Sequence, residues 1–507
     1  MTTQATAPAP HSWHVAPRWV ILILLALAGL AVLAYFQAVL AALLVVVAVV
    51  VVVAWVRPFW VFAGLLALLP FHEQVVRIVT WQLGWPASRI TLLSLWKEGI
   101  IVLLAAVILV QHFSGRRRIR AKAYRFDLWL AALVLLAAAY ILVAATVSIG
   151  VYGFRNYFEP LAVFFLVRLM PFSRREMTRL LVLLTAVAVV VALFGVYQAR
   201  FIDFPTMVSM GYLDEFGNLP FAFKTALQDG VPRPRAISTV TGPNQLAIYL
   251  NIFILLTGYA LVRLRSGAFR SLARQAVLVV LLAIYVLCLL LTYSRGGLLA
   301  LAVSLLGTGL IVIYERGVKR TWHELIHNRW LWLAMAAAAV AAVGGLVVTG
   351  FARRIWRGLT GQDPAALGHL TSLNDALGFL TYNPLGIGMG MAGPRALRFT
   401  LDAQIQHTES TYLQFGMELG LIGMALLLVV LLSLVATLWR IRQRQKASGD
   451  TGGTVLAEVA LVTWLGALAV FAVTPLMQNF LVAAYLWLVA GLAFHLDAYR
   501  GAVGSDQ

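Results

Sequence analysis

The sequence predicts an all-α polytopic membrane protein with about 12–14 transmembrane helices. Of its 507 residues, 62% are hydrophobic and only 12% are charged, and the mean hydropathy is +0.88. Soluble globular proteins are roughly half apolar and about a quarter charged, so this composition excludes that class. Apolar runs recur from Trp19 to His495. The single cysteine, Cys288, lies in one of them, so no internal disulfide can order the loops.

The apolar runs place the expected helices along the chain. The first three lie at about 19–37, 38–56 and 58–70, and the number of helices before residue 92 stays open because the third run is short for a bilayer of about 30 Å. The others are expected at about 92–111, 127–149, 157–170, 178–199, 243–263, 275–293, 296–314, 330–350, 411–438, 455–474 and 476–495.

The basic residues predict the orientation in the membrane. The formal net charge of +19 comes largely from Lys and Arg clusters between the apolar runs, as expected for cytoplasmic loops rather than for a nucleic-acid binder. All clusters fall on one side of the proposed helices. We therefore expect both termini in the cytoplasm, with residues 1–18 disordered and residues 496–507 as a tail. The clusters begin at Arg116, Arg168, Arg263, Arg316 and Arg440.

Two long polar segments, about 200–242 and 351–410, fall on the opposite side of the membrane. Loops of this length are usually functional or disordered, so we expect them to cap a single transmembrane domain at residues 19–495. The second segment is predicted to contain an amphipathic surface helix that ends near Pro384, followed by a flexible turn, GIGMGMAGP. The apolar side chains of this helix are Leu370, Leu373, Leu377 and Leu380.

Three arginines on the outer side predict an anion-binding site. Arg295 lies in LTYSRGGLL, a tight turn between two apolar runs, where a lone Arg is costly unless it is paired or faces water. Arg155 lies in the outer turn VYGFRNYFEP, and Arg235 precedes a helix in PRPRAISTV. Arg binds phosphate through two hydrogen bonds and stays charged, which suits a lipid-linked diphosphate. The alternative is that Arg295 has a structural partner.

The stretch HTESTYLQFGMELGLIG places titratable groups at the start of a long apolar helix. Glu409 could be a general base that accepts a proton from a sugar hydroxyl, and His407 could act instead or orient it. The structural alternative is that Glu409 only complements the positive end of the helix dipole. Glu418 is expected to be paired inside the bundle. The small-residue stripe expected to pack this helix is Gly416, Gly420 and Gly423.

Several other residues are secondary candidates for substrate binding or for support of the site. Asn244 stands at a helix start after Pro243, where it caps the helix or helps to aim the helix N-terminus at a phosphate. His323 and His327 lack a third ligand, so no metal or other cofactor is expected. The secondary candidates for substrate binding are Asn244, His369, Tyr412, Arg353 and Arg357.

Four stretches occur in order along the chain: RAISTVTGPNQLA, TYSRGGLLAL, NPLGIGMG and ESTYLQFGMELGLIG. Together they resemble the motifs of the O-antigen ligase/polymerase superfamily, and the resemblance extends from about Lys97 to Gly423. Members of this family are polytopic enzymes that transfer glycans from undecaprenyl diphosphate at the outer face of the bacterial inner membrane. The resemblance therefore implies a multi-pass protein of that membrane with its active site facing the periplasm.

Two positions depart from the ligase pattern. Where ligases have a His, eleven residues before Gly420, this chain has Glu409. Where the amphipathic helix usually begins with an Arg, fifteen residues before Pro384, this chain has His369. The Glu looks more like the polymerase-type members, so the resemblance favours a polymerase over a ligase.

The resemblance further implies a GT-C-type fold and a metal-independent, inverting glycosyl transfer. Arg295 and Arg235, with Arg155, would bind the diphosphate, and Glu409 or His407 would deprotonate the acceptor hydroxyl. The implied partners are an undecaprenyl-diphosphate-linked oligosaccharide, an acceptor glycan, the lipid bilayer and a chain-length regulator, with no nucleic acid.

Two other functions remain open. A ligase would use the same chemistry but transfer the glycan to lipid A-core or to protein, and no sequence feature identifies the acceptor. A lipid-linked glycan flippase or secondary transporter belongs to another class. Transporters tend to have internal repeats and a polar site near the bilayer midplane. No repeat is evident in this sequence, and its candidate groups gather at the outer face, which favours an enzyme.

Overall fold

The computed structural model describes residues 23–31, 38–116, 122–213, 218–226, 232–263, 272–317, 364–393 and 408–503. The chain divides into two units, Met1–Val61 and Phe62–Gln507. Every described candidate residue lies in the second unit. The segment 1–18 and the helix expected at 330–350 lie outside the described residues, so both stay predictions.

The first unit contains helical residues 23–31, α2 (Ala38–Val56) and the start of α3 (Pro58–Leu68). The prediction of a helix at 38–56 is confirmed.

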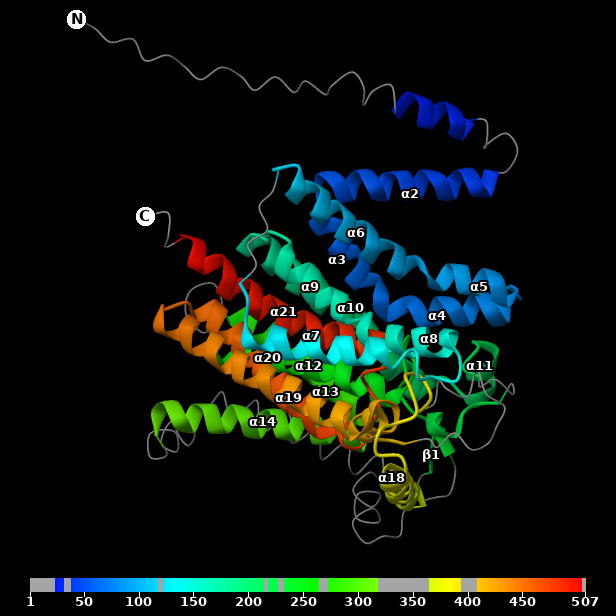
Figure 1. Cartoon of the computed structure of the whole chain (residues 1–507), viewed down its shortest axis with the longest axis vertical. Coiled ribbons are helices and arrows are strands. Elements are labelled where there is room, and N and C mark those ends of the chain that lie inside the picture. Colours follow the sequence, from blue (N-terminus) through cyan, green and yellow to red (C-terminus); the bar gives the residue numbers. More distant parts are fainter. Residues whose placement is uncertain are drawn as a thin grey trace, which may run out of the picture. The chain divides into compact units, whose positions relative to one another are not determined.

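Long apolar helices make up most of the second unit and confirm an all-α multi-pass membrane protein (Figure 1). In the described part of the chain, nine helical segments are long and apolar enough to cross a membrane. They are α3 continued by η1 (Leu69–Phe71), α4 (His72–Arg77) and η2 (Ile78–Gln82); α5 (Ala87–Ser94) with α6 (Trp96–Phe113); α10 (Arg174–Phe201); α12 (Pro243–Arg263); α13 (Leu272–Leu291); α14 (Arg295–Arg316); α19 (Thr411–Ala447); α20 (Thr451–Phe471); and α21 (Phe480–Val503).

Three shorter helices correct the predicted spans between residues 125 and 170. They are α7 (Arg125–Ala139), α8 (Val147–Phe158) and α9 (Leu161–Leu169). Arg155 was expected in an outer turn but lies within α8. The reason is local: the Thr146 side chain accepts a hydrogen bond from Ile149 N and caps the helix, and no proline interrupts it before Pro160.

The centre of the bundle is formed by α20 and α21. Within the apolar 18-residue stretch of each helix, 78% of the residues of α20 and 89% of those of α21 are buried. The corresponding share is 28% in α13 and in α14. Outer helices instead expose apolar side chains, such as Leu135 of α7 and Leu306 of α14, each about 70% exposed. Apolar exposure of this kind is expected of helices that face lipid rather than water.

The segment 200–242 was expected to be a polar loop, but it contains folded elements. These are α11 (Phe204–Ser209), η3 (Phe221–Phe223) and the antiparallel strands β1 (Lys224–Ala226) and β2 (Pro232–Pro234), in which Thr225 lies opposite Arg233. Met207, Tyr212 and Ile237 form a small buried cluster beneath them. The cluster gives this cap a core of its own.

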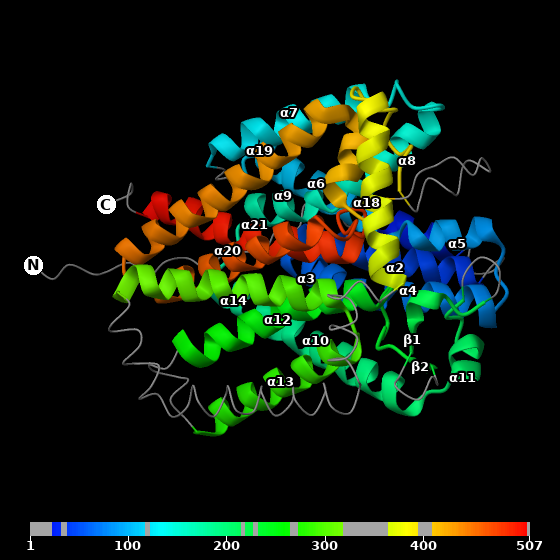
Figure 2. The ribbon, with the colours of Figure 1, turned by 90° about the horizontal axis from the view of Figure 1, so that it is seen from below.

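The expected amphipathic helix is present as α18 (Pro364–Tyr382), which runs across the bundle helices rather than alongside them (Figure 2). Its apolar stripe is divided. Ala376 and Leu380 are buried against Ala392 and Met417, whereas Leu370 and Leu377 are more than half exposed.

Ion pairs gather at one end of the bundle, which we call the basic end. There Arg168 binds Asp127 and Arg444 binds Asp497, at 2.6 and 2.9 Å, and Arg442 binds Glu458 at 2.8 Å. The opposite end is where α14, α19 and α21 begin and α10 ends, and we call it the site end. The described candidate residues lie there.

Candidate functional site

The start of α19 is fixed by the segment 472–479, which connects α20 to α21. Thr411 Oγ1 donates to the carbonyl of Thr474 (2.8 Å) and accepts from Leu476 N (3.2 Å). Ser410, the N-cap of α19, donates to the carbonyl of Phe471 (3.3 Å). These buried bonds hold Glu409, which precedes the N-cap residue, at the site end.

The start of α14 is fixed just as firmly. Ser294 caps the helix by accepting from Gly297 N (3.0 Å), and its hydroxyl donates to Asn244 Oδ1 (2.8 Å). Tyr293 takes a left-handed conformation, with φ of 51°, which turns the chain into the helix. Arg295 is therefore the first residue of α14 rather than part of a free turn. Asn244, a secondary candidate for substrate binding, serves here to hold the Ser294 cap.

The two helix starts lie against the same connecting segment. A Cβ atom on Gly296 would lie 3.0 Å from Val470 and 3.4 Å from Thr474, so the absence of a side chain lets α14 approach α20 and segment 472–479 closely. Thr474 also accepts from Thr411 at the start of α19. The sequence predicted a site at both helix starts, and the structure brings both onto one segment.

Arg295 and Glu409 influence each other electrostatically. Burial raises the pKa of the Glu409 carboxyl above its ordinary value, and the positive charge of Arg295 lowers it in part. The side chain of Glu409 remains 36% exposed, so a substrate can reach it. A carboxylate with a raised pKa is a better proton acceptor than an ordinary Glu.

His369 of α18 completes this group. Its Nδ1 contacts Glu409 Oε2, and its side chain is 38% exposed. The sequence placed His369 only among secondary substrate-binding candidates, because forty residues separate it from Glu409. The structure brings α18 back over the start of α19 and makes a trio of Arg295, Glu409 and His369.

Arg235 is buried and binds backbone carbonyls. Its Nε donates to the carbonyl of Thr292 (2.7 Å) and Nη1 donates to the carbonyl of Ala222 (2.8 Å), while its own main-chain N–H donates to Phe223 (2.9 Å). These bonds tie the cap to the end of α13, three residues before Arg295. The contacts fit a residue that holds the Arg295 turn in place.

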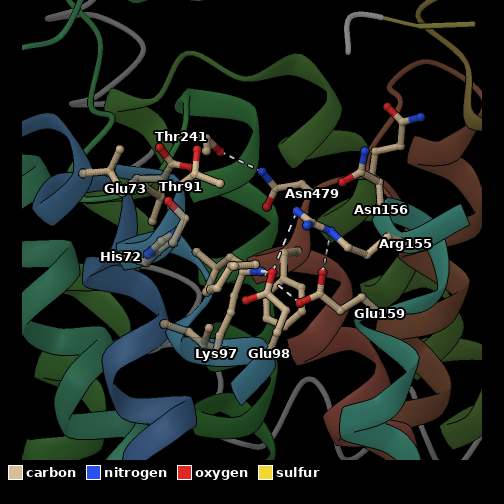
Figure 3. A pocket seen from close by; sticks show the side chains of 18 of the residues that line it. His72, Glu73, Thr91, Lys97, Glu98, Arg155, Asn156, Glu159, Thr241 and Asn479 are labelled. Atoms are coloured by element: carbon tan, nitrogen blue, oxygen red, sulfur yellow. Dashed lines mark hydrogen bonds and ion pairs between the residues drawn. The ribbon is translucent and has the colours of Figure 1, made fainter. Parts of the chain in front are cut away.

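Arg155 lies in a polar cavity of about 600 Å³ that is shown in Figure 3. Its Nε is 3.5 Å from Glu159 and Nη2 is 3.8 Å from Glu98, and its side chain is 43% exposed. The almost buried Lys97 bridges the same two carboxylates, with its Nζ 2.8 Å from Glu159. No motif in the sequence pointed to Glu159, which directly follows α8.

This cavity and the Arg295 group adjoin the same connecting segment. Asn479, at the end of segment 472–479, donates to Thr241 Oγ1 (2.7 Å), and both residues line the cavity. Thr241 lies in the stretch between Arg235 and Asn244. The segments that hold Arg295 and Glu409 therefore also form one wall of the cavity that contains Arg155.

The glycine-rich stretch after α18 is bound to a kink in α19. Gly420 interrupts the helix with φ of 72°. The freed carbonyls of Met417 and Glu418 accept from Ile387 N (2.9 Å) and Gly388 N (3.0 Å). The turn predicted to be flexible is thus hydrogen-bonded along α19. Gly420 is closely packed, since a Cβ there would lie 2.5 Å from the Leu385 carbonyl carbon, and it also breaks the helix, which the sequence did not predict.

The remaining candidates divide into two groups. Tyr412 donates its hydroxyl to the carbonyl of Leu468 (2.8 Å), which braces α19 against α20. Glu418 was expected to be paired inside the bundle; it is buried there, and its Oε1 accepts from the main-chain N–H of Ala392 (3.4 Å). His407, Arg353 and Arg357 lie outside the described residues. Within the described ranges, no group of three or more His, Cys, Asp or Glu side chains is arranged to hold a metal ion.

Taken with the fold, this site defines a multi-pass membrane protein whose reactive groups gather at one end of the helix bundle. Residues 277–428 match the family model described as O-antigen ligase, a region that includes Arg295, His369 and Glu409. The match confirms the resemblance to the O-antigen ligase/polymerase superfamily, whose members are glycosyltransferase-like enzymes. No curated protein matches the chain.

Proposed function

We propose that this protein is a polysaccharide polymerase of the O-antigen or exopolysaccharide type. It transfers an undecaprenyl-diphosphate-linked glycan to a hydroxyl of an acceptor glycan. The observation that carries the proposal is the trio at the site end, in which Arg295 and His369 both act on a partly exposed Glu409. Such a group supplies a cation for a leaving diphosphate next to a base for an acceptor hydroxyl.

In this mechanism Glu409 is the general base. The acceptor oxygen attacks the anomeric carbon of the donor as its proton passes to the Glu409 carboxylate. The bond from that carbon to the diphosphate oxygen breaks, and its electron pair leaves on the diphosphate. A single displacement of this kind inverts the anomeric configuration, and we propose that it needs no metal. His369 orients the carboxylate, while His407 is the alternative base.

Arg295 stabilises the negative charge that develops on the leaving diphosphate. Its place at the first turn of α14 adds the positive end of the helix dipole. We assign Arg155, whose side chain is 43% exposed, to the same anion from the adjoining cavity. Arg235 supports the site by holding the Thr292 carbonyl before Arg295. Arg353 and Arg357 remain proposed contacts to the glycan from the cap loop.

We place the reaction at the outer face of the bacterial inner membrane, within a GT-C-type fold. The support is the charge distribution: the basic end carries Arg168, Arg442 and Arg444, and the positive-inside bias assigns such an end to the cytoplasm. Both termini would then be cytoplasmic, and the site end would face the periplasm. A chain-length regulator is proposed as a further partner.

A ligase that transfers the glycan to lipid A-core or protein is the second candidate. The observation that favours it is the matched family model, which is described as O-antigen ligase. The observation against it is Glu409, which stands where the ligase pattern has a His.

The test uses purified protein and a lipid-diphosphate-linked oligosaccharide, with products separated on a gel. A ladder of longer lipid-linked glycans without added acceptor is the expected result. Glu409→Gln should lower the rate by about 10²–10⁴-fold, the usual contribution of a general base, whereas Asp375→Asn, at an exposed position of α18, is a matched control that should leave the rate unchanged. Transfer only after lipid A-core is added would establish the ligase instead. Absence of transfer under both conditions would overturn the proposal.

A further inference from the structure

An apolar groove runs along the lipid-facing side of α14, α19 and α20, which lie together in Figure 2. Its volume is about 680 Å³, within the range of about 300–1,000 Å³ that is typical of ligand sites. Leu461 and Leu465 of α20 form its floor. The three helices are all long and apolar enough to cross the membrane, so the groove opens toward the bilayer.

The sequence builds the groove from helical spacing. On α19, Leu432, Ala436 and Arg440 follow one another at intervals of four residues and so share one face. On α14, Gly307 contributes no side chain, and a Cβ there would lie 3.0 Å from Leu465. The missing side chain deepens the groove beside α20.

The groove ends in a positive charge at the basic end. The last turns of α19 carry four basic residues. Arg442 binds Glu458, Arg444 binds Asp497, and Lys446 binds Glu315. Arg440 is exposed at the mouth of the groove and makes no ion pair with a described residue.

Aromatic side chains mark the same level of the groove. Tyr314 and Trp439 line it and pack edge to face, with ring centroids 5.6 Å apart. Tyr and Trp are enriched where a membrane helix passes from hydrocarbon into the headgroup region. Arg440 therefore lies at headgroup depth, one residue beyond Trp439.

We propose that this groove binds an anionic phospholipid, with an acyl chain between α14 and α19 and the phosphate on Arg440. A bare apolar groove would accept any lipid, but Arg440 adds a fixed cation that distinguishes anionic from zwitterionic headgroups. Basic pockets between transmembrane helices recognise anionic headgroups by this combination. The site lies at the opposite end of the bundle from Glu409 and does not depend on the transfer reaction.

The test is native mass spectrometry of delipidated protein in detergent. The probes are dioleoyl phosphatidylglycerol and dioleoyl phosphatidylcholine. We expect higher occupancy by phosphatidylglycerol, and Arg440→Gln should weaken its binding about fivefold, the effect of one basic side chain at an anionic surface. Arg179→Gln removes an exposed charge from α10 and is the matched control, which should leave occupancy unchanged.

A second variant tests the acyl-chain part of the site. Ala436→Trp places a large side chain in the groove at an exposed position, so the helix packing should be preserved. It should lower occupancy by both lipids, and an unchanged melting temperature without lipid would confirm that each variant is folded. Equal binding of the two lipids, equal loss in Arg440→Gln and Arg179→Gln, or full phosphatidylglycerol binding by Ala436→Trp would each overturn the proposal.

Discussion

The two ends of the helix bundle use charge in different ways. At the basic end, Arg442 is fully buried and binds Glu458 and Glu315, so its charge is matched by carboxylates on the neighbouring helices. At the site end, helix starts are held by backbone and hydroxyl hydrogen bonds, through Ser294 and Thr411. Arg295 is only partly buried, and Glu409 and His369 remain more than a third exposed.

This difference separates structural charge from charge available to a ligand. A buried Arg with two carboxylate partners has little capacity left for a substrate, whereas a partly exposed group held by its backbone keeps that capacity. The cavity at the site end is intermediate. Lys97 there is almost buried between Glu98 and Glu159, yet the cavity wall also contains the more exposed Arg155.

The largest expected effect is on stability at the basic end. Arg442→Ala should lower the free energy of unfolding by about 3–5 kcal/mol, because it removes a fully buried cation that Glu458 and Glu315 share. Unfolding in mixed micelles would measure this loss. Arg175→Ala, an exposed change in the first turn of α10, should shift it by less than about 0.5 kcal/mol. Similar losses for both variants would contradict the structural role of Arg442.

The next effect is on catalysis at the site end. Arg295→Gln should reduce glycan transfer by about 10²–10³-fold, the usual loss when one group that stabilises transition-state charge is removed. Its stability should change little, because α14 remains capped by Ser294. Arg233→Gln, which removes an exposed charge from β2, is the control for a general change in potential. If Arg295→Gln clearly lowers stability but the folded variant retains its specific activity, the comparison between the two ends fails.

A smaller effect concerns the kink that shapes the site end. Gly420→Ala should lower stability by about 1–2 kcal/mol or more, because φ is +72° and the new Cβ would lie 2.5 Å from the Leu385 carbonyl carbon. Gly309→Ala in α14, where nothing lies within 4 Å, should instead stabilise the helix by up to about 1 kcal/mol. Thermal melting of the pair measures the difference. Equal melting temperatures would show that the kink is not required.

The smallest effect is a shift in pH dependence. Burial raises the pKa of the Glu409 carboxyl above its ordinary value. Because the base must be ionised to accept a proton, the transfer rate should increase as the pH rises through that pKa. Arg295 opposes the shift. The residual activity of Arg295→Gln should therefore have its acid limb at higher pH than wild type, as measured by kcat/KM profiles. An acid limb at lower pH would mean that Arg295 does not act on Glu409.

Local sequence patterns determined much of the fold. Hydropathy alone located α10, α12, α13, α14, α20 and α21 to within a few residues at most of their ends, because a helix in lipid must satisfy its own backbone and present apolar side chains. It underestimated α19 and the run from Pro58 to Gln82, where polar residues continue the helices. It missed the β1–β2 pair, whose short strands carry no alternation long enough to detect.

The sequence by itself determined that reactive residue types stand at the starts of α14 and α19. It could not determine that His369 contacts Glu409, that Arg235 donates hydrogen bonds to main-chain carbonyls, or that Arg155 shares a cavity with Lys97. Those relations join His369 to Glu409, Arg235 to Thr292 and Arg155 to Lys97, which are forty or more residues apart in the sequence. Periodicity and hydropathy describe the secondary structure and the buried face of each segment, but not which other segments it contacts. Which helix starts meet is decided by the packing of the whole bundle, and that is set by tertiary contacts alone.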